Sequence, residues 1–182
     1  IWSCGDKTKK ISEIVEVDME MQMSNAYKEG YFELQRGDVL LAAKKFNEAE
    51  LLFPQSPWAA KSAIMAAYAY YTQNYYGDAI FELERYLVTY PNHKDKAYAH
   101  FLLGMSFYEQ IVDEKKDLKS ILDSRKQFEI IIKEYPGTEF AMDSKFKIDL
   151  INEILAAKEM YIARYYLKKN KWIPALNRFK TV

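Results

Sequence analysis

Three aromatic-proline pairs recur along this chain at intervals of roughly one helical hairpin. They are Phe53-Pro54, Tyr90-Pro91 and Tyr135-Pro136, and their prolines are 37 and 45 residues apart. Proline lacks a main-chain donor and clashes with the preceding helical turn, so each pair predicts the end of a helix. Regular breaks at this period indicate a repeat protein.

One known repeat length fits these breaks. When the prolines are set at position 32 of a tetratricopeptide (TPR) unit of about 34 residues, small residues fall at positions 8 and 20 and large apolar residues at position 24. The small residues are Gly30, Ala42, Ala67, Ala79, Gly104, Ser124, Ala163 and Ala175; the large ones are Phe46, Leu83, Phe128 and Phe179. Antiparallel helices cross closely only where side chains are small, and bulky neighbours fill the seam. The sequence therefore predicts an all-α fold, a TPR α-solenoid of antiparallel helix pairs.

The expected organisation is a polar arm over residues 1–20 followed by a solenoid over residues 21–182, with about four repeats. Within the solenoid we expect helices at 23–35, 39–53, 57–73, 77–90, 94–110, 120–135, 139–169 and 171–182. The helix from 139 is about twice as long as an ordinary first TPR helix. The last helix ends without a glycine or proline stop, so we expect the natural chain to continue.

Composition narrows the function. Lys and Arg together number 26, and Asp and Glu together also number 26, so the chain lacks the basic excess that nucleic-acid binding normally needs. Hydrophobic residues make up 49% of the chain, which disfavours disorder. No uncharged run reaches the length of about 18–20 apolar residues that a transmembrane helix requires.

No enzyme, metal or cofactor site is expected. The chain has one cysteine and two histidines, with no phosphate-binding glycine loop and no paired cysteines for zinc. We expect His93 at the surface, in the turn that follows a helix, and His100 in helix packing. Glu82 and Glu84 fall on different helix faces and are expected to be solvated charges. The pattern favours a binding scaffold.

An aromatic stripe is predicted on the first helices of the repeats, where positions 2, 5, 9 and 12 line the concave face. The stripe comprises Ser24, Tyr27, Tyr31 and Leu34, then Lys61, Ile64, Tyr68 and Tyr71, then Tyr98, Phe101, Met105 and Tyr108. Tyrosine offers a large contact area, a polar tip and only two side-chain torsions to order. We therefore expect a groove that binds an extended or amphipathic peptide, the alternative being that these rings pack between helices.

Co-chaperone TPR domains use this groove differently, clamping a peptide carboxylate with Lys and Asn at positions 5 and 9. Here those positions hold Tyr27 and Tyr31 in the first repeat, and Ile64 and Tyr68 in the second. A co-chaperone clamp is therefore disfavoured.

Several segments together resemble the BamD family, the TPR lipoproteins of the outer-membrane β-barrel assembly (BAM) machinery. They are residues 27–30, 42–46, 53–58, 66–71, 90–94, 108–113, 158–160, 164–168 and 172–179. The similarity covers about residues 22–182 and is strongest to α-proteobacterial members.

The resemblance implies a periplasmic lipoprotein at the outer membrane that works with the barrel protein BamA and other BAM lipoproteins. It implies that the N-terminal half receives unfolded β-barrel substrates through an aromatic C-terminal signal. It also implies that the C-terminal half docks on a POTRA domain of BamA.

Three residues acquire roles from this resemblance. Cys4 is expected to be lipidated, because Ile1 and Ser3 occupy the aliphatic and small positions of a lipobox. Arg178 and Trp172 are expected to bind BamA, Arg178 pointing outward because it precedes the seam residue Phe179 by about 100° of helix rotation. Another periplasmic TPR lipoprotein, acting as an adaptor in envelope or cell-division coordination, remains the main alternative; a co-chaperone and a TPR-fold enzyme are weaker ones.

Overall fold

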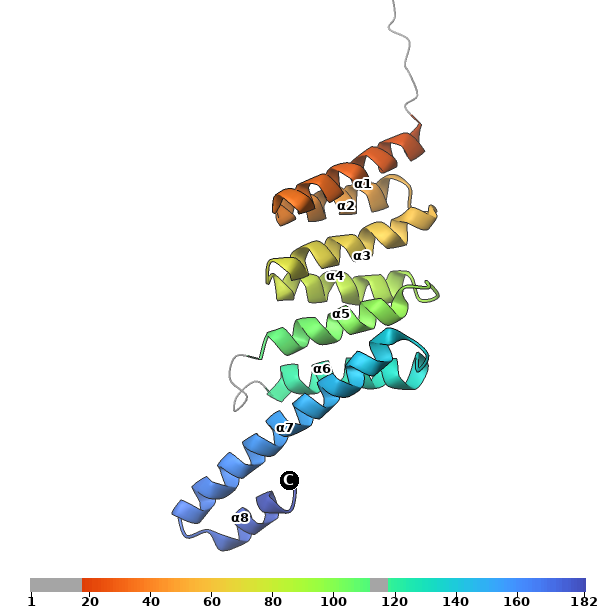
Figure 1. Ribbon diagram of the computed structural model, residues 1–182. Helices are drawn as coiled ribbons and strands as arrows, with labels where there is room; N and C mark the ends of the chain where they lie inside the picture. The colour runs from red at the N-terminus through yellow and green to blue at the C-terminus, as the bar shows by residue number, and fades with distance from the viewer. Residues whose placement is uncertain (1–17, 112–117) are drawn as a thin grey trace, which may run out of the picture.

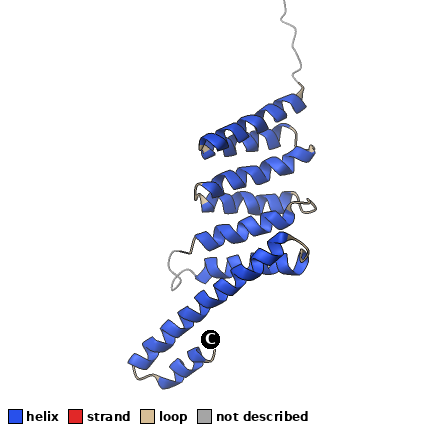
Figure 2. Ribbon diagram, in the orientation of Figure 1, coloured by secondary structure: helices blue, strands red, loops and turns tan. Residues whose placement is uncertain are grey.

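Eight helices stack in chain order in the part of the chain that the computed structural model describes, residues 18–111 and 118–182 (Figure 1). The helices are α1 (Met19–Arg36), α2 (Val39–Leu52), α3 (Pro57–Thr72), α4 (Tyr76–Thr89), α5 (Lys96–Glu109), α6 (Leu118–Glu134), α7 (Glu139–Lys168) and α8 (Trp172–Phe179). Each packs on the next, and these residues contain no strand (Figure 2). The predicted all-α TPR solenoid is confirmed.

Local chemistry ends the helices where the sequence suggested. Each aromatic-proline pair lies directly after a second helix, α2, α4 or α6. Helix α1 ends at Arg36, followed by Gly37, whose φ of 84° lies in the left-handed region that favours glycine. Asp38 then caps α2 by accepting a hydrogen bond from the Leu41 N–H at 3.1 Å. Ser56 caps α3 in the same way, through the Trp58 N–H.

Four predicted boundaries differ from the observed ones by two residues or more, and one of them is the start of α6, at Leu118 rather than at 120. Helix α1 begins at Met19 rather than at 23, because Asp18 accepts a hydrogen bond from the Glu20 N–H at 3.0 Å and starts the helix earlier. Helix α5 begins at Lys96 rather than at 94, after a turn that includes His93. Helix α8 ends at Phe179 rather than at 182.

The seams are built from the residues predicted for positions 8, 20 and 24. Ala42, Phe46, Ala79, Leu83 and Phe128 are fully buried. The Ser124 hydroxyl also donates to the Gly104 carbonyl at 2.8 Å, so the crossing of α5 and α6 is hydrogen-bonded as well as close. Phe179, in the last pair, is only half-buried.

Helix α7 departs from the regular stack. Its first half packs on α6 and also contacts α5, whereas its second half runs past α6 and carries α8 (Figure 1). The expected helix of about double length is thus confirmed, with 30 residues. It places α8 at the opposite end of the molecule from α1.

Candidate functional site

An aromatic surface runs across α1, α3 and α5, the first helices of the three complete repeats. We call it the aromatic face, and it comprises Tyr27, Tyr31, Tyr68, Tyr71, Tyr98, Phe101 and Tyr108. Tyr31 is 49% exposed, and the other six side chains are half-buried. They are half-buried because they pack against the buried residues of the core beneath them.

Burial holds Tyr27, Tyr71 and Tyr98 of this face in the neutral form, because it raises the pKa of each. Burial raises the pKa of Tyr27, and the nearby Tyr31 adds to the effect. Burial, with smaller contributions from Tyr68 and Tyr71, raises the pKa of Tyr98 to about 12. The aromatic face therefore offers uncharged rings with hydroxyl groups at neutral pH.

Trp58 joins this face although the sequence analysis did not assign it a role. Its ring centroid lies 5.4 Å from that of Tyr27, and the Lys61 Nζ lies 4.7 Å above the Trp58 ring. Trp58 lines two hollows, one shared with α1 and one shared with the turn before α5. The sequence could have indicated this role, because Trp58 lies in the first turn of α3, just after Ser56-Pro57, where a side chain projects beyond the end of the helix pair.

The far end of the aromatic face is covered by α7. The Phe140 ring lies 5.4 Å from Phe101 and 5.6 Å from Tyr98, and the Lys147 Nζ lies 4.6 Å above the Tyr108 ring. Phe101 also contacts Phe128 of α6 at 5.9 Å. Phe101 therefore packs within the fold, as the alternative interpretation of the stripe allowed, and the more open part of the face lies between α1 and α3.

The two histidines occupy different environments. His100 is buried as expected, and its Nδ1 lies 2.8 Å from the Gln127 Oε1. His93 is not the free surface residue that we expected, since its Nδ1 lies 2.8 Å from the hydroxyl of the buried Tyr86. The turn after Pro91 folds His93 back onto α4, an arrangement that the local sequence did not reveal.

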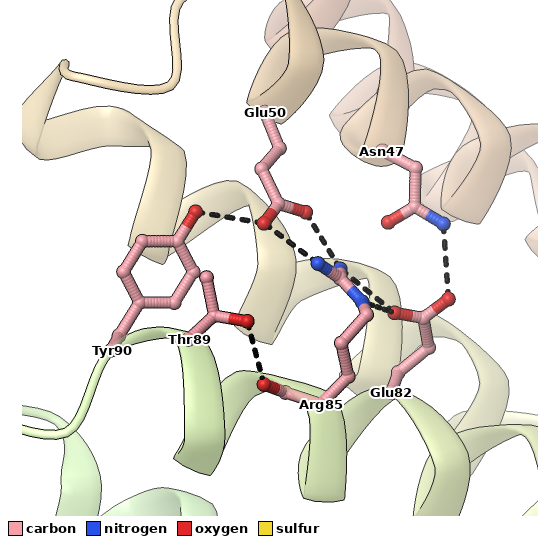
Figure 3. A network of polar contacts seen from close by, with 6 residues as sticks. All are labelled: Asn47, Glu50, Glu82, Arg85, Thr89 and Tyr90. Carbon is pink, nitrogen blue, oxygen red and sulfur yellow. Dashed lines mark hydrogen bonds and ion pairs between the residues drawn. The ribbon is translucent and has the colours of Figure 1, made fainter.

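Glu82 is likewise not a solvated charge. It is 8% exposed and belongs to a polar cluster between α2 and α4 (Figure 3). The Arg85 guanidinium donates two hydrogen bonds to the Glu50 carboxylate, at 2.6 and 2.8 Å, and a third to Glu82 at 3.0 Å. Tyr90 donates to Glu50 at 2.7 Å, and Asn47 donates to Glu82 at 3.1 Å. We call these five residues the α2–α4 clasp; it joins the second helices of two repeats.

Helix α8 presents the two residues expected to bind a partner. Trp172 is 65% exposed and lies beside the exposed Ile173 and Leu176. Arg178 points outward, but its Nη1 donates to the Glu159 carboxylate of α7 at 3.0 and 3.3 Å. Both residues are accessible, and Arg178 already has an acidic partner within the chain.

The remaining expectations concern anchors and ions. Cys4 lies outside the described residues. Between residues 18 and 111 and from 118 onward, no three His, Cys, Asp or Glu side chains gather in a way that would hold a metal ion. None of the helices in those two ranges has the length and apolar character needed to cross a membrane.

Comparison with known proteins gives one consistent family. Residues 19–182 match the YfiO family, described as outer membrane lipoprotein. A relative from Caulobacter vibrioides, named outer membrane protein assembly factor BamD, is 36% identical over 98% of this chain and 58% of its own length. A protein of the same name from Rickettsia prowazekii is 34% identical over 98% of this chain and 69% of its own length, and one from Neisseria gonorrhoeae is 27% identical over 92% and 66%. This chain thus spans a little under three fifths of the Caulobacter relative.

Proposed function

Because this chain belongs to the YfiO family of outer membrane lipoproteins, we propose that it is a non-catalytic assembly factor for outer membrane proteins. Its relatives carry that function in their name. In this proposal the residues that precede α1 form an arm that is lipid-anchored through Cys4, on the periplasmic side of the outer membrane. The solenoid from α1 onward is the binding part, and it works within a complex that contains BamA and other lipoproteins.

The aromatic face is the proposed receiving surface for unfolded β-barrel substrates. The observation that carries this proposal is the run of neutral, half-buried tyrosines from α1 to α5, with Trp58 between two hollows. Aromatic rings with little torsional freedom bind extended peptides at a small entropic cost. An unfolded β-strand presents alternate side chains on one side, so its aromatic residues can meet successive helices.

Helix α8 is the proposed docking surface for a POTRA domain of BamA. Trp172, Ile173 and Leu176 form an exposed apolar patch, and such patches on soluble domains commonly mark protein interfaces. Arg178 lies on the same short helix and has the fork geometry that suits a bidentate carboxylate contact. On docking, Arg178 would either leave Glu159 for a carboxylate of the partner or bind both carboxylates.

Binding of a labelled peptide tests the receiving surface. The probe is a ten-residue peptide that alternates aromatic and polar residues and ends in phenylalanine, followed by fluorescence anisotropy. Tyr68→Ala should weaken binding about tenfold, since truncation of an interfacial aromatic commonly costs about 1–3 kcal/mol. Tyr75→Ala, an exposed tyrosine at the start of α4, is the matched control and should bind as the wild type does.

A double variant makes this test stricter. Tyr31→Ala/Tyr68→Ala removes an exposed and a half-buried ring from neighbouring helices. Circular dichroism should show unchanged helicity. Peptide binding by the double variant at wild-type affinity would refute the aromatic face as the receiving surface.

A further inference from the structure

A hollow of about 640 Å³ lies where the start of α3 meets the turn before α5. Pro57, Trp58 and Lys61 line it from α3, and residues 92–95 line it from the turn. It adjoins the aromatic face at Trp58, so a peptide that lies on that face can reach it. The wall is part aromatic and part polar, which suits a ligand that has an apolar group beside a charged one.

Two lysines that line this hollow, Lys61 and Lys94, have no carboxylate partner among the described residues. The Lys61 Nζ lies over the rings of Trp58 and Tyr27, at 4.7 and 5.6 Å from their centroids, so its position is already restricted. The one acidic group in the lining, Asp95, lies 3.7 Å from the His93 Nδ1. The lysines therefore outnumber the acid.

The His93 ring also lines the hollow. The Asp95 N–H donates to its Nδ1 at 3.4 Å, and the Tyr86 hydroxyl lies 2.8 Å from the same atom. These contacts hold the turn that forms one wall of the hollow against α4.

Helix ends support the same polarity. Helix α3 begins at Pro57 and helix α5 at Lys96, so two positive helix termini flank the hollow. The start of α5 has no side-chain cap hydrogen bond. Partial positive charge from the helices thus reinforces that of the two lysines.

We propose that this hollow binds a carboxylate group of an extended peptide, with Lys61 and Lys94 as its cationic partners and Trp58 packed against the neighbouring apolar side chain. The proposal rests on the peptide-receiving function proposed above and names the chemistry that it recognises. A terminal carboxylate and an Asp or Glu side chain present the same group. The ammonium groups of Lys61 and Lys94, which line the hollow together with the Trp58 ring, favour a carboxylate over a neutral amide.

Three labelled peptides distinguish these sources by fluorescence anisotropy. They share the alternating aromatic sequence and end in a free carboxylate, in an amide, or in an amide with aspartate as the penultimate residue. The wild type should bind the free acid about tenfold more tightly than the plain amide. This preference should shrink at high ionic strength, because charge attraction is screened. Tight binding of the aspartate peptide instead would assign the site to an acidic side chain, which also supports carboxylate recognition.

The double variant Lys61→Gln/Lys94→Gln should abolish the preference for the carboxylate, so that the free acid and the plain amide bind with equal affinity. Lys44→Gln, which removes one charge from an exposed lysine on α2, is the control and should retain the preference. An unchanged preference in the double variant overturns the site, as does equal binding of all three peptides by the wild type. If the wild type binds all three peptides equally, the proposed function still stands as long as Tyr68→Ala weakens that binding. If no peptide binds the wild type, both proposals fall.

Discussion

Pairs of residues at positions 8 and 24 set how closely the two helices of each repeat approach. A Cβ added to Gly30 would lie 2.9 Å from the Phe46 ring, and one added to Gly104 would lie 2.8 Å from the Phe128 ring. Repeat two has Ala67 at the first position and the smaller Leu83 at the second, both buried in one cluster. In repeats one and three the buried phenylalanine thus leaves room only for glycine opposite it, and in repeat two leucine leaves room for a methyl group. The last pair combines Ala163 with Phe179, which is only half-buried.

Gly104→Ala should therefore lower the free energy of unfolding by about 1–3 kcal/mol, because the new methyl group overpacks the seam. Gly77→Ala, in the first turn of α4, is the control, since nothing lies within 4 Å of its added Cβ. That control should be neutral or slightly stabilising. Urea unfolding measures both, and Gly104→Ala/Phe128→Leu should recover stability. A fully stable Gly104→Ala would contradict the close crossing of α5 and α6.

His100 should make stability depend on pH. Burial lowers the pKa of its imidazole and outweighs the hydrogen bond to Gln127, which acts in the opposite direction. Above the ordinary histidine pKa of about 6.5 the ring is neutral in both the folded and the unfolded state, so its contribution to stability is complete. As the pH falls below that value the unfolded chain takes up a proton that folded His100 resists, so the free energy of unfolding should fall.

Urea unfolding at about pH 7.5 and about pH 5.5 checks this sign. His100→Gln should lose less stability between the two pH values than the wild type does. His93 is present in both proteins, so the difference between them reports on His100 alone. Equal losses would mean that His100 protonates as readily in the folded as in the unfolded state.

Among the elements, α2 and α4 are joined by side chains that meet across a repeat boundary. In the α2–α4 clasp, Glu50 and Glu82 are nearly buried, and Arg85 is their shared cation (Figure 3). Hydrogen bonds to Glu50, followed by other interactions with Glu50 and Glu82, raise the pKa of Arg85 above its ordinary value, so its charge is permanent. Such a pair specifies one register between repeats, because a shifted helix would leave both acids unpaired.

Arg85→Met should lower the free energy of unfolding by about 2–3 kcal/mol, because two desolvated carboxylates then lack their cation. Arg36→Met is the control; it breaks an exposed pair with Glu33 and should cost less than about 1 kcal/mol. Urea unfolding at neutral pH measures the difference. Near-equal losses in the two variants would show that the clasp contributes no more than a surface ion pair.

Helix α8 combines its proposed partner contact with an internal one. Arg178→Glu would place its carboxylate opposite Glu159, so a loss of stability of up to about 1 kcal/mol is expected along with loss of BamA in a pull-down. The charge swap Glu159→Arg/Arg178→Glu restores the internal pair. The swap should restore the free energy of unfolding, but BamA should still be absent from the pull-down. Recovery of BamA by the swap would mean that Arg178 only positions α8 and does not contact the partner.

The whole molecule separates two surfaces along one continuous stack. The open part of the aromatic face lies near α1 and α3, and α8 lies at the other end, beyond the second half of α7 (Figure 1). A substrate bound to the first surface and a partner bound to the second would therefore not compete for the same residues. The elongated α7 produces this separation.

Membrane attachment is proposed for the arm that precedes the stack. Cys4→Ser, expressed behind a lipoprotein secretion signal, should move from the outer-membrane fraction to the soluble periplasm. Acyl chains contribute about 0.8 kcal/mol per buried methylene to membrane attachment, so their loss removes the anchor. The wild type and the variant are fractionated from cells depleted of BamA, because BamA could otherwise hold the variant at the outer membrane without a lipid anchor. A variant that stays with the outer membrane under those conditions would disprove the anchor.

The sequence alone determined the helices, their order and the seams of the solenoid. Prolines, caps and the small residues at positions 8 and 20 act through local sterics and through contacts within one repeat, so their spacing is sufficient evidence. The unusual length of α7 was predictable for the same reason, since no breaker interrupts residues 139–168. The aromatic stripe followed from helical period.

Only the tertiary structure decided which of these side chains pair across repeats. Arg85 meets Glu50, Glu82 meets Asn47, His93 meets Tyr86, and Phe140 covers Phe101, each through the angle at which one helix pair stacks on the next or the way a turn folds back. Trp58 gained its place between two hollows in the same way. These contacts depend on the twist between neighbouring repeats, which arises from the packing of many side chains together and leaves no period in the sequence.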